Sequence, residues 1–190
     1  NKGSINSSKN EIFIIADVNK KNVFLGEQIT LTYKLYKHID TKISGVDQFQ
    51  MPDFDGFWVE ELFTPQRLQY QNKEVLYQGR KYQVANLGQR ALFPIVSDVH
   101  IIPSVKIKTQ IEKNKKKRRR DPFFDPFFNS FFTETDTKYI QSDEVKVIVK
   151  PFPVPKPSNF IGAVGDFKIS VEIDQTEVNL NEGVTFTVSM

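Results

Sequence analysis

The chain has 190 residues, of which 39% are hydrophobic and 26% charged, and it contains no cysteine. This length and composition are typical of one well-cored globular domain, or of one domain and part of another, and they exclude a largely disordered chain. The absence of cysteine excludes a disulfide framework, a thiolate zinc site and a cysteine nucleophile, and no apolar run approaches the ~20 residues of a membrane span.

The positive charge is concentrated in one segment. The formal net charge is +3, but residues 113–120 carry seven of the 26 cations, and the other 19 face 23 acidic residues, a net charge of −4. Outside this segment the surface is therefore expected to be mildly acidic. The sequence begins with Asn1 and shows no signal peptide, so we expect a processed or trimmed N-terminus.

Alternating and β-branched runs predict strands along almost the whole chain. Residues 28–36 alternate strictly between apolar and polar side chains, and no stretch of twelve residues shows a helical stripe. After an N-terminal tail, residues 1–10, the sequence predicts an all-β fold, an antiparallel β-sandwich over residues 11–150. The runs expected to form strands are 12–18, 28–36, 73–85, 89–95, 99–110 and 144–149.

A basic and Phe-rich segment separates the last two strands of this domain, and we expect a long loop over residues 112–138. Six consecutive cations precede three Phe pairs that are spaced four residues apart, and Pro126 argues against a helix. Loops of this length in compact domains are usually functional or disordered. The candidate contact residues are Lys115, Lys116, Lys117, Arg118, Arg119, Arg120, Phe123, Phe124, Phe127, Phe128, Phe131 and Phe132.

Four interpretations of this segment are open. Nucleic-acid binding is disfavoured, because the cations form one contiguous run on an otherwise acidic domain. A peripheral membrane contact fits better, since cations attract anionic headgroups while Phe side chains enter the interface. Docking to a partner protein fits comparably well. In the simplest alternative the Phe pairs fold back onto the sandwich and the cations are only solvated.

A proline-rich linker and an internal repeat predict a second domain. Residues 151–158 carry prolines at four alternate positions, which predicts a semi-rigid polyproline spacer. Residues 16–33 (ADVNKKNVFLGEQITLTY) match residues 171–188 (VEIDQTEVNLNEGVTFTV) at a constant offset of 155, without a gap. Each copy reads as a strand, a turn carrying Glu and an alternating second strand, as at the start of an immunoglobulin-like β-sandwich. We therefore expect residues 159–190 to begin a second immunoglobulin-like domain.

Patterns that carry catalysis or metal binding are missing from the sequence. His38 and His100 have no partner at ligand or triad spacing, which favours a structural or exposed role. Residues 53–56 (Asp-Phe-Asp-Gly) resemble a fragment of a calcium loop but lack its other oxygen ligands, so we expect a turn. Residues 162–165 (Gly-Ala-Val-Gly) are not followed by Lys-Ser/Thr or a helix, so they favour a tight turn into the second domain over a phosphate loop. We expect no enzymatic activity, cofactor or metal ion.

Several stretches together resemble the N-terminal part of the BatD family, from the aerotolerance operons of Bacteroides type. They are the repeated strand pair, Met51-Pro-Asp-Phe-Asp-Gly-Phe57, Asp121-Pro-Phe-Phe-Asp-Pro-Phe-Phe128 and Pro157-Ser-Asn-Phe-Ile-Gly-Ala-Val-Gly-Asp-Phe167. The resemblance covers essentially the whole chain, and Phe-Ile-Gly-Ala-Val-Gly after the proline linker is its most specific part.

This resemblance implies a non-enzymatic protein–protein interaction module on the periplasmic face of the inner membrane, because family members carry a signal sequence and a C-terminal membrane anchor. It implies an envelope complex linked to oxygen tolerance and stress response. The implied partners are von Willebrand factor A-domain proteins and tetratricopeptide proteins of the same operon type, encoded beside a MoxR-type ATPase.

A carbohydrate- or surface-binding adhesin is the alternative from another functional class. Such a site needs exposed aromatic rings with Asn, Asp or Gln beside them, and the local candidates are Trp58 and Tyr70 with Gln69 and Gln71. Trp58 follows a glycine turn and precedes Val59, so we expect it in the core.

Overall fold

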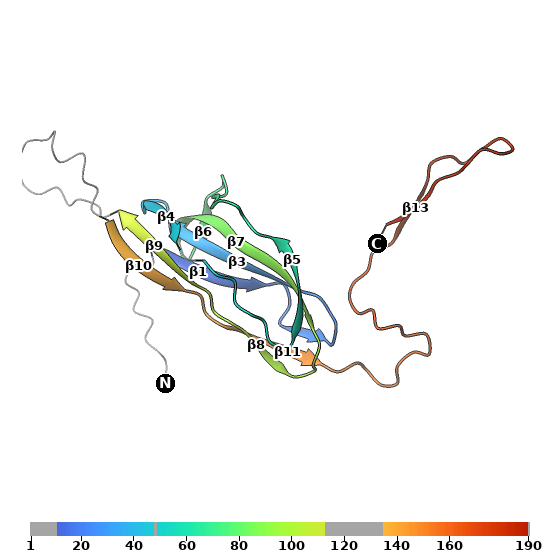
Figure 1. The fold of residues 1–190 in the computed structure, drawn as a ribbon, viewed down its shortest axis with the longest axis horizontal. Helices are drawn as coiled ribbons and strands as arrows, with labels where there is room; N and C mark the ends of the chain where they lie inside the picture. The colour runs from blue at the N-terminus through green and yellow to red at the C-terminus, as the bar shows by residue number, and fades with distance from the viewer. Residues whose placement is uncertain (1–10, 48, 113–134, 190) are drawn as a thin grey trace, which may run out of the picture.

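The computed structural model describes residues 11–47, 49–112 and 135–189, and every regular element in these ranges is a β-strand (Figure 1). The prediction of an all-β fold is confirmed. In these ranges there is accordingly no helix of the length and apolarity that a membrane crossing requires. The strands are β1 (Ile12–Val18), β2 (Asn22–Phe24), β3 (Ile29–His38), β4 (Ile43–Asp47), β5 (Phe57–Phe63), β6 (Val75–Tyr77), β7 (Arg80–Pro94), β8 (Val99–Ile102), β9 (Lys106–Glu112), β10 (Thr135–Gln141), β11 (Val145–Lys150), β12 (Ser170–Ile173) and β13 (Phe186–Ser189).

The first layer of the sandwich is an antiparallel sheet in the order β1-β3-β7-β5, with β6 also paired to β7. The long β7 pairs with β3 along one edge, and with β6 and then β5 along the other. The predicted alternation of β3 holds, since its inward side chains are completely buried. These are Ile29, Leu31, Tyr33 and Leu35, each 0% exposed.

The second layer consists of two three-stranded sheets, β10-β9-β4 and β2-β11-β8. β9 follows β8 in the chain, and β11 follows β10, so the two sheets continue one another. The β8–β9 run and the β10–β11 run are interrupted at the same level, where Val105 and Ser142 are hydrogen-bonded to each other. The Ser142 N–H donates to the Val105 carbonyl at 3.0 Å, and the Val105 N–H donates to Ser142 Oγ at 3.0 Å. Pro103, which has no N–H to donate, accounts for the break on the β8–β9 side.

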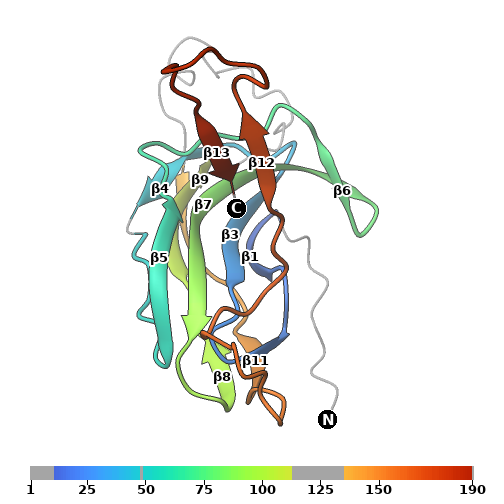
Figure 2. The same cartoon turned by 90° about the vertical axis from the view of Figure 1, so that its right-hand side faces the viewer.

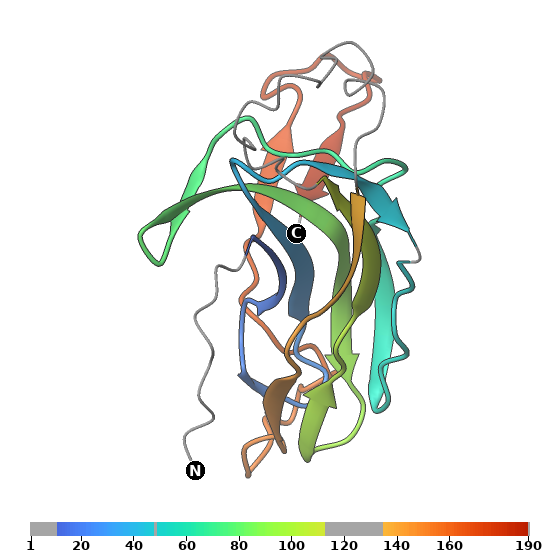
Figure 3. The same cartoon turned by 90° about the vertical axis from the view of Figure 1, so that its left-hand side faces the viewer.

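β1 and β2 belong to different layers, because the chain crosses between them at residues 19–21. β1 pairs with β3 in the first layer, and β2 pairs with β11 in the second. The β2–β11 pairing is parallel, whereas the other strand pairs of the described residues are antiparallel, as in the sandwich that the sequence predicts. Figures 2 and 3 show the first layer from its two sides, with β9 behind it in one view and in front of it in the other, and with the β6–β7 hairpin bending away.

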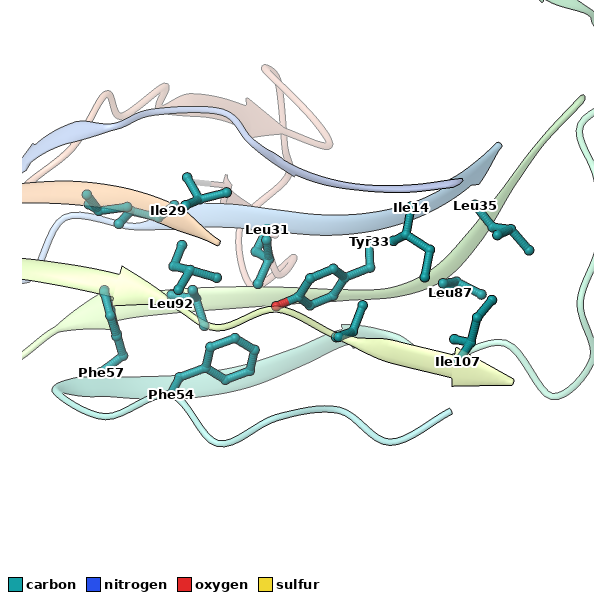
Figure 4. Packing of buried hydrophobic residues seen from close by; sticks show 14 of the residues in the cluster. Ile14, Ile29, Leu31, Tyr33, Leu35, Phe54, Phe57, Leu87, Leu92 and Ile107 are labelled. Atoms are coloured by element: carbon teal, nitrogen blue, oxygen red, sulfur yellow. The ribbon is translucent and has the colours of Figure 1, made fainter. Parts of the chain in front are cut away.

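The core lies between these layers (Figure 4). Tyr33 joins the layers across it, since its ring is fully buried and its hydroxyl donates to the Pro103 carbonyl at 2.7 Å. Burial raises the pKa of this hydroxyl. The remaining core side chains come from both layers and from the β4–β5 loop. The buried cluster is Ile12, Ile14, Val23, Ile29, Leu31, Tyr33, Leu35, Phe54, Phe57, Leu87, Leu92, Ile102, Val105, Ile107, Ile111, Val145, Val147 and Val149.

The predicted turn over residues 53–56 is confirmed, and it explains the position of His100. Gly56 has φ of 81°, and a Cβ there would overlap the His100 ring. The His100 ring lies against Phe57, tilted by 60° with ring centroids 4.9 Å apart, and its Nε2 lies 2.8 Å from the Val96 carbonyl oxygen. His100 therefore packs against the core residue Phe57, which fits the structural or exposed role expected from the sequence.

The two copies of the internal repeat have the same strand register. Ala16 lies opposite Tyr33 in the first copy, and Val171 lies opposite Val188 in the second. These positions differ by the same 155 residues that separate the sequences. The equivalence therefore extends from the amino-acid pattern to the pairing of the backbone.

The turn inside each copy also matches, hydrogen bond by hydrogen bond. Glu27 accepts the Phe24 N–H at 2.9 Å, and its equivalent Glu182 accepts the Asn179 N–H at 2.8 Å. The residue before each glutamate is left-handed, Gly26 with φ of 75° and Asn181 with φ of 74°. Glycine or asparagine is the residue type that this conformation favours.

The two copies differ in what covers their apolar side chains. Val23, Ile29 and Leu31 in the first copy are at most 2% exposed in the core between the two layers. The equivalent residues of the second copy are exposed on the β12–β13 hairpin. They are Val178 (44%), Val184 (44%) and Phe186 (64%).

The proline linker is not the extended spacer that the sequence predicts. The rings of Phe152 and Phe160 are 5.0 Å apart, and the Lys156 ammonium lies 4.9 Å and 5.9 Å from their centroids. Eight residues of polyproline helix would separate the two rings by about 25 Å. Proline fixes φ but not ψ, so the linker can bend. The ring–ring and cation–π contacts stabilise the bend.

The expected loop over residues 112–138 is too long at its C-terminal end. β10 begins at Thr135, which lies opposite Glu112 of β9, so residues 135–138 belong to a strand. This edge strand begins Thr-Asp-Thr-Lys and has no apolar face there, which is why its sequence gives no strand pattern.

Candidate functional site

The basic and Phe-rich contact residues predicted from the sequence, Lys115–Arg120 and the six phenylalanines from Phe123 to Phe132, lie outside the described residues. So does the N-terminal tail, residues 1–10. The flanking strands place the two ends of the segment side by side, since Glu112 and Thr135 are paired. A partner or membrane contact through this segment stays a prediction.

Trp58 is not in the core, contrary to the expectation from its sequence neighbours. Its side chain is 55% exposed on the outer face of β5, whereas the adjacent Phe57 is buried at 8%. Successive strand residues point to opposite faces, so only one of the two can enter the core, and the turn at Gly56 gives that position to Phe57. Trp58 lies against Phe93 of β7, with ring centroids 5.0 Å apart.

A surface hollow of about 310 Å³ lies where the strand ladder along β7 is interrupted. β5 leaves β7 after Phe63, which lies opposite Gln89, and pairing resumes only at Tyr70, which lies opposite Ala85. Residues 64–69 between these pairs make no ladder contact. The hollow is lined by Phe63, Thr64, Pro65, Gln66, Arg67, Gln69, Gln71 and Asn86.

Two buried polar atoms in this region have no hydrogen-bond partner in the described part of the chain, Asn86 Oδ1 and the Tyr70 hydroxyl. Tyr70 is not part of the lining of the hollow, and its ring lies 5.1 Å from the Lys37 ammonium. Burial raises the pKa of the Tyr70 hydroxyl and lowers the pKa of Lys37. Asn86, in contrast, is part of the lining.

The two arginines near the hollow differ in their partners. Arg90 is only 11% exposed, pairs with Glu61 at 2.8 Å and donates to the Phe63 carbonyl at 3.1 Å, so it braces one wall. Arg67 forms no ion pair with a carboxylate of the described residues. The hollow thus carries a cation that is not neutralised by the described fold.

A second hollow, of about 510 Å³, lies between the first copy of the repeat and residues 162–167. The Lys20 ammonium lies 2.7 Å from Glu27 and 3.2 Å from Asp166 at its edge. The one ammonium is already engaged by both carboxylates, so we interpret this contact as structural. The predicted tight turn before the hairpin fits the positive φ of Gly162 (100°) and Gly165 (151°).

The sequence-predicted sugar candidates are divided by the fold. Gln69 and Gln71 line the first hollow, but Trp58 lies near the other end of β5 and Tyr70 is turned inward. Phe63, Arg67 and Asn86 were not predicted as site residues. The run Gln66-Arg-Leu-Gln-Tyr-Gln71 is unusually rich in long polar side chains for a strand connection, and it is the one signal that could have indicated them.

No three metal-ligating side chains come together in the ranges that the structure describes. Comparison of the chain with protein-family models, curated proteins and solved structures gives no match.

Proposed function

We propose that the chain is a non-enzymatic, extracytoplasmic protein-interaction module of a membrane-anchored, BatD-like protein. The observation that carries this proposal is the repeat, in which residues 16–33 and 171–188 share sequence, register and turn hydrogen bonds. A chain that repeats the first strands and turn of a β-sandwich consists of consecutive β-sandwich domains. Such arrays of domains present surfaces to partner proteins. The periplasmic location, the envelope complex and its role in oxygen and stress tolerance rest on the resemblance of the sequence to the BatD family.

The test is crosslinking and affinity recovery of the full-length protein from its native envelope. We expect co-recovery of von Willebrand factor A-domain and tetratricopeptide proteins. Recovery of glycans or DNA in place of such proteins would overturn the proposal.

The same experiment can assign the contact to a segment. Because Glu112 and Thr135 are paired, a two-residue Asn-Gly turn can join β9 to β10 in place of residues 113–134. We expect this shortened protein to keep its unfolding temperature and to lose the partners. Retention of the partners would move the contact to the sandwich itself.

A carbohydrate-binding adhesin is the second candidate, and the exposure of Trp58 beside Phe93 favours it. Sugar rings stack on exposed aromatic side chains of this kind. A glycan array tests it with Trp58→Ser as the matched variant, and an array without hits removes this candidate.

A further inference from the structure

The hollow beside β7 contains a hydrogen-bond acceptor and a cation that have no partner among the described residues. Asn86 Oδ1 is buried without a donor, and Arg67 has no carboxylate partner in the described ranges. Buried side-chain polar atoms are paired in the large majority of cases, so an unpaired one calls for an explanation. Rotation about the soft terminal torsion of Asn86 would bring its amide to a ligand in the hollow.

The side chains around the hollow define the chemistry of that ligand. Gln69, Gln71 and Asn86 each offer an amide that both donates and accepts, which matches neighbouring hydroxyl groups. Phe63, 45% exposed, and Pro65 supply an apolar wall for a C–H face. Arg67 supplies a planar fork of donors, the geometry that pairs best with a carboxylate.

We propose that this hollow is a binding subsite for a carbohydrate residue that carries a carboxylate, such as a uronic acid within a polysaccharide. Amides alone would suit a neutral sugar, but the un-neutralised Arg67 selects the acidic one. The volume of about 310 Å³ lies at the lower end of the range of ligand pockets, which fits a single sugar ring. This subsite is independent of the proposed role in an envelope complex.

The wall of the hollow is held in place before any ligand arrives. Arg90 bonds to the carbonyl of Phe63, and its guanidinium is fixed by Glu61 and by the carbonyl of Gln89 at 2.9 Å. Phe63 is also held to β7 by its ladder pairing. Gln71 is held to β7 by the hydrogen bond that its N–H donates to the Val84 carbonyl at 2.8 Å. Little conformational entropy is then lost on binding at these positions.

The test is calorimetric titration of the chain with a galacturonic acid trisaccharide and with its neutral galactose counterpart, with amide NMR shifts to locate the contact. We expect the acidic trisaccharide to bind and to shift the backbone amides of residues 63, 64 and 66–71 and of Asn86. Arg67→Gln should weaken its binding by about tenfold or more, the effect of losing one charge-assisted pair. The matched control is Arg80→Gln, an exposed arginine at the β6–β7 turn, which should leave the affinity unchanged.

Three outcomes would overturn the proposal. The first is the absence of heat and of shifts with the acidic trisaccharide at about 1 mM, the weak limit for a specific subsite. The second is equal binding of the neutral trisaccharide. The third is an equal loss in both arginine variants, which would mean nonspecific charge attraction. The thermal unfolding of each variant is measured alongside, and Gln71→Ala tests the same site without a change of charge.

Discussion

At the scale of single residues, Glu27 holds a turn together through its side chain. The Glu27 side chain is 12% exposed. Its carboxylate accepts a hydrogen bond from the Phe24 N–H at 2.9 Å and one from the Lys20 ammonium at 2.7 Å. Burial by itself would raise the pKa of Glu27, but the hydrogen bonds from Lys20 and Phe24 outweigh it and lower the pKa below its ordinary value. The charged form is therefore the one that the fold stabilises.

Glu27→Gln should lower the free energy of unfolding by about 1–2 kcal/mol near neutral pH, because a charge-assisted backbone hydrogen bond is weakened. The pKa of Glu27 is lower in the folded than in the unfolded state. Its contribution is thus fully present above the ordinary glutamate pKa of about 4.3, and it is lost as pH falls through the lower folded value. Urea unfolding at a series of pH values should show the gap between the native protein and the variant closing in acid. Glu60→Gln, an exposed glutamate of β5, is the control and should show no gap; a gap that is constant with pH would contradict the assignment.

The neighbours Phe57 and Trp58 should respond very differently to truncation. Phe57→Ala empties a core position and should cost about 3–5 kcal/mol. Trp58→Ser removes one exposed ring contact with Phe93 and should cost about 1 kcal/mol or less. Urea unfolding of the two variants measures both values. Similar losses would mean that Trp58 is covered in solution.

At the scale of elements, central strands could be predicted from the sequence and several edge strands could not. β3 and β11 bury one complete face, so their apolar residues alternate visibly, as in Val145, Val147 and Val149. β4 and β10 lie at sheet edges and bury little of either face, so no periodic signal marks them.

The candidate site was harder to predict, because it depends on pairing across the sheet. Gln69 and Asn86 are distant in sequence and meet only because the ladder along β7 stops at Gln89 and resumes at Ala85. The local sequence pattern does not indicate where this interruption of the β7 ladder lies. The polar run over residues 66–71 could indicate half of the site at most.

The β6–β7 hairpin has a two-residue turn in which both residues are left-handed, Gln78 with φ of 48° and Gly79 with φ of 77°. Glutamine tolerates this conformation poorly, whereas asparagine visits it readily. Gln78→Asn should therefore stabilise the protein by about 0.5–1 kcal/mol, and Gly79→Ala should destabilise it by about 1 kcal/mol. Thermal unfolding of the two variants gives opposite shifts if the turn is as described. Shifts of the same sign would contradict it.

The segment that joins β9 to β10 supports a prediction from its sequence alone. Its cations should attract anionic lipid by about 1 kcal/mol each near a membrane surface, with the Phe side chains anchoring the contact. We expect the protein to float with anionic liposomes, and a variant with Phe127, Phe128, Phe131 and Phe132 changed to Ser to float less. If neither floats, the membrane interpretation is wrong. If the variant instead unfolds at a much lower temperature, the Phe pairs belong to the core.

At the scale of the whole molecule, the repeat provides an internal comparison between a covered and an uncovered copy of one structure. The strand pairs β1–β3 and β12–β13 have equivalent registers, and the turns have equivalent hydrogen bonds. Local sequence and backbone geometry are therefore nearly constant between the copies. What differs is the second layer, which covers residues such as Leu31 and leaves Phe186 64% exposed.

This comparison predicts how hydrogen exchange should differ between the two copies. A backbone hydrogen bond opens locally at little cost unless packed side chains hold the strands together, so protection follows the covering layer and not the ladder alone. In the 190-residue chain, the amides of residues 171–173 and 186–188 should exchange far faster than the equivalent amides of residues 16–18 and 31–33. An isolated two-stranded hairpin is marginally stable in water, which places its protection near zero. Amide exchange followed by NMR at several protein concentrations measures both sets in one sample. Equal protection at every concentration would show that the hairpin is covered within one molecule, and protection that grows with concentration would show that a second copy covers it through its exposed apolar face.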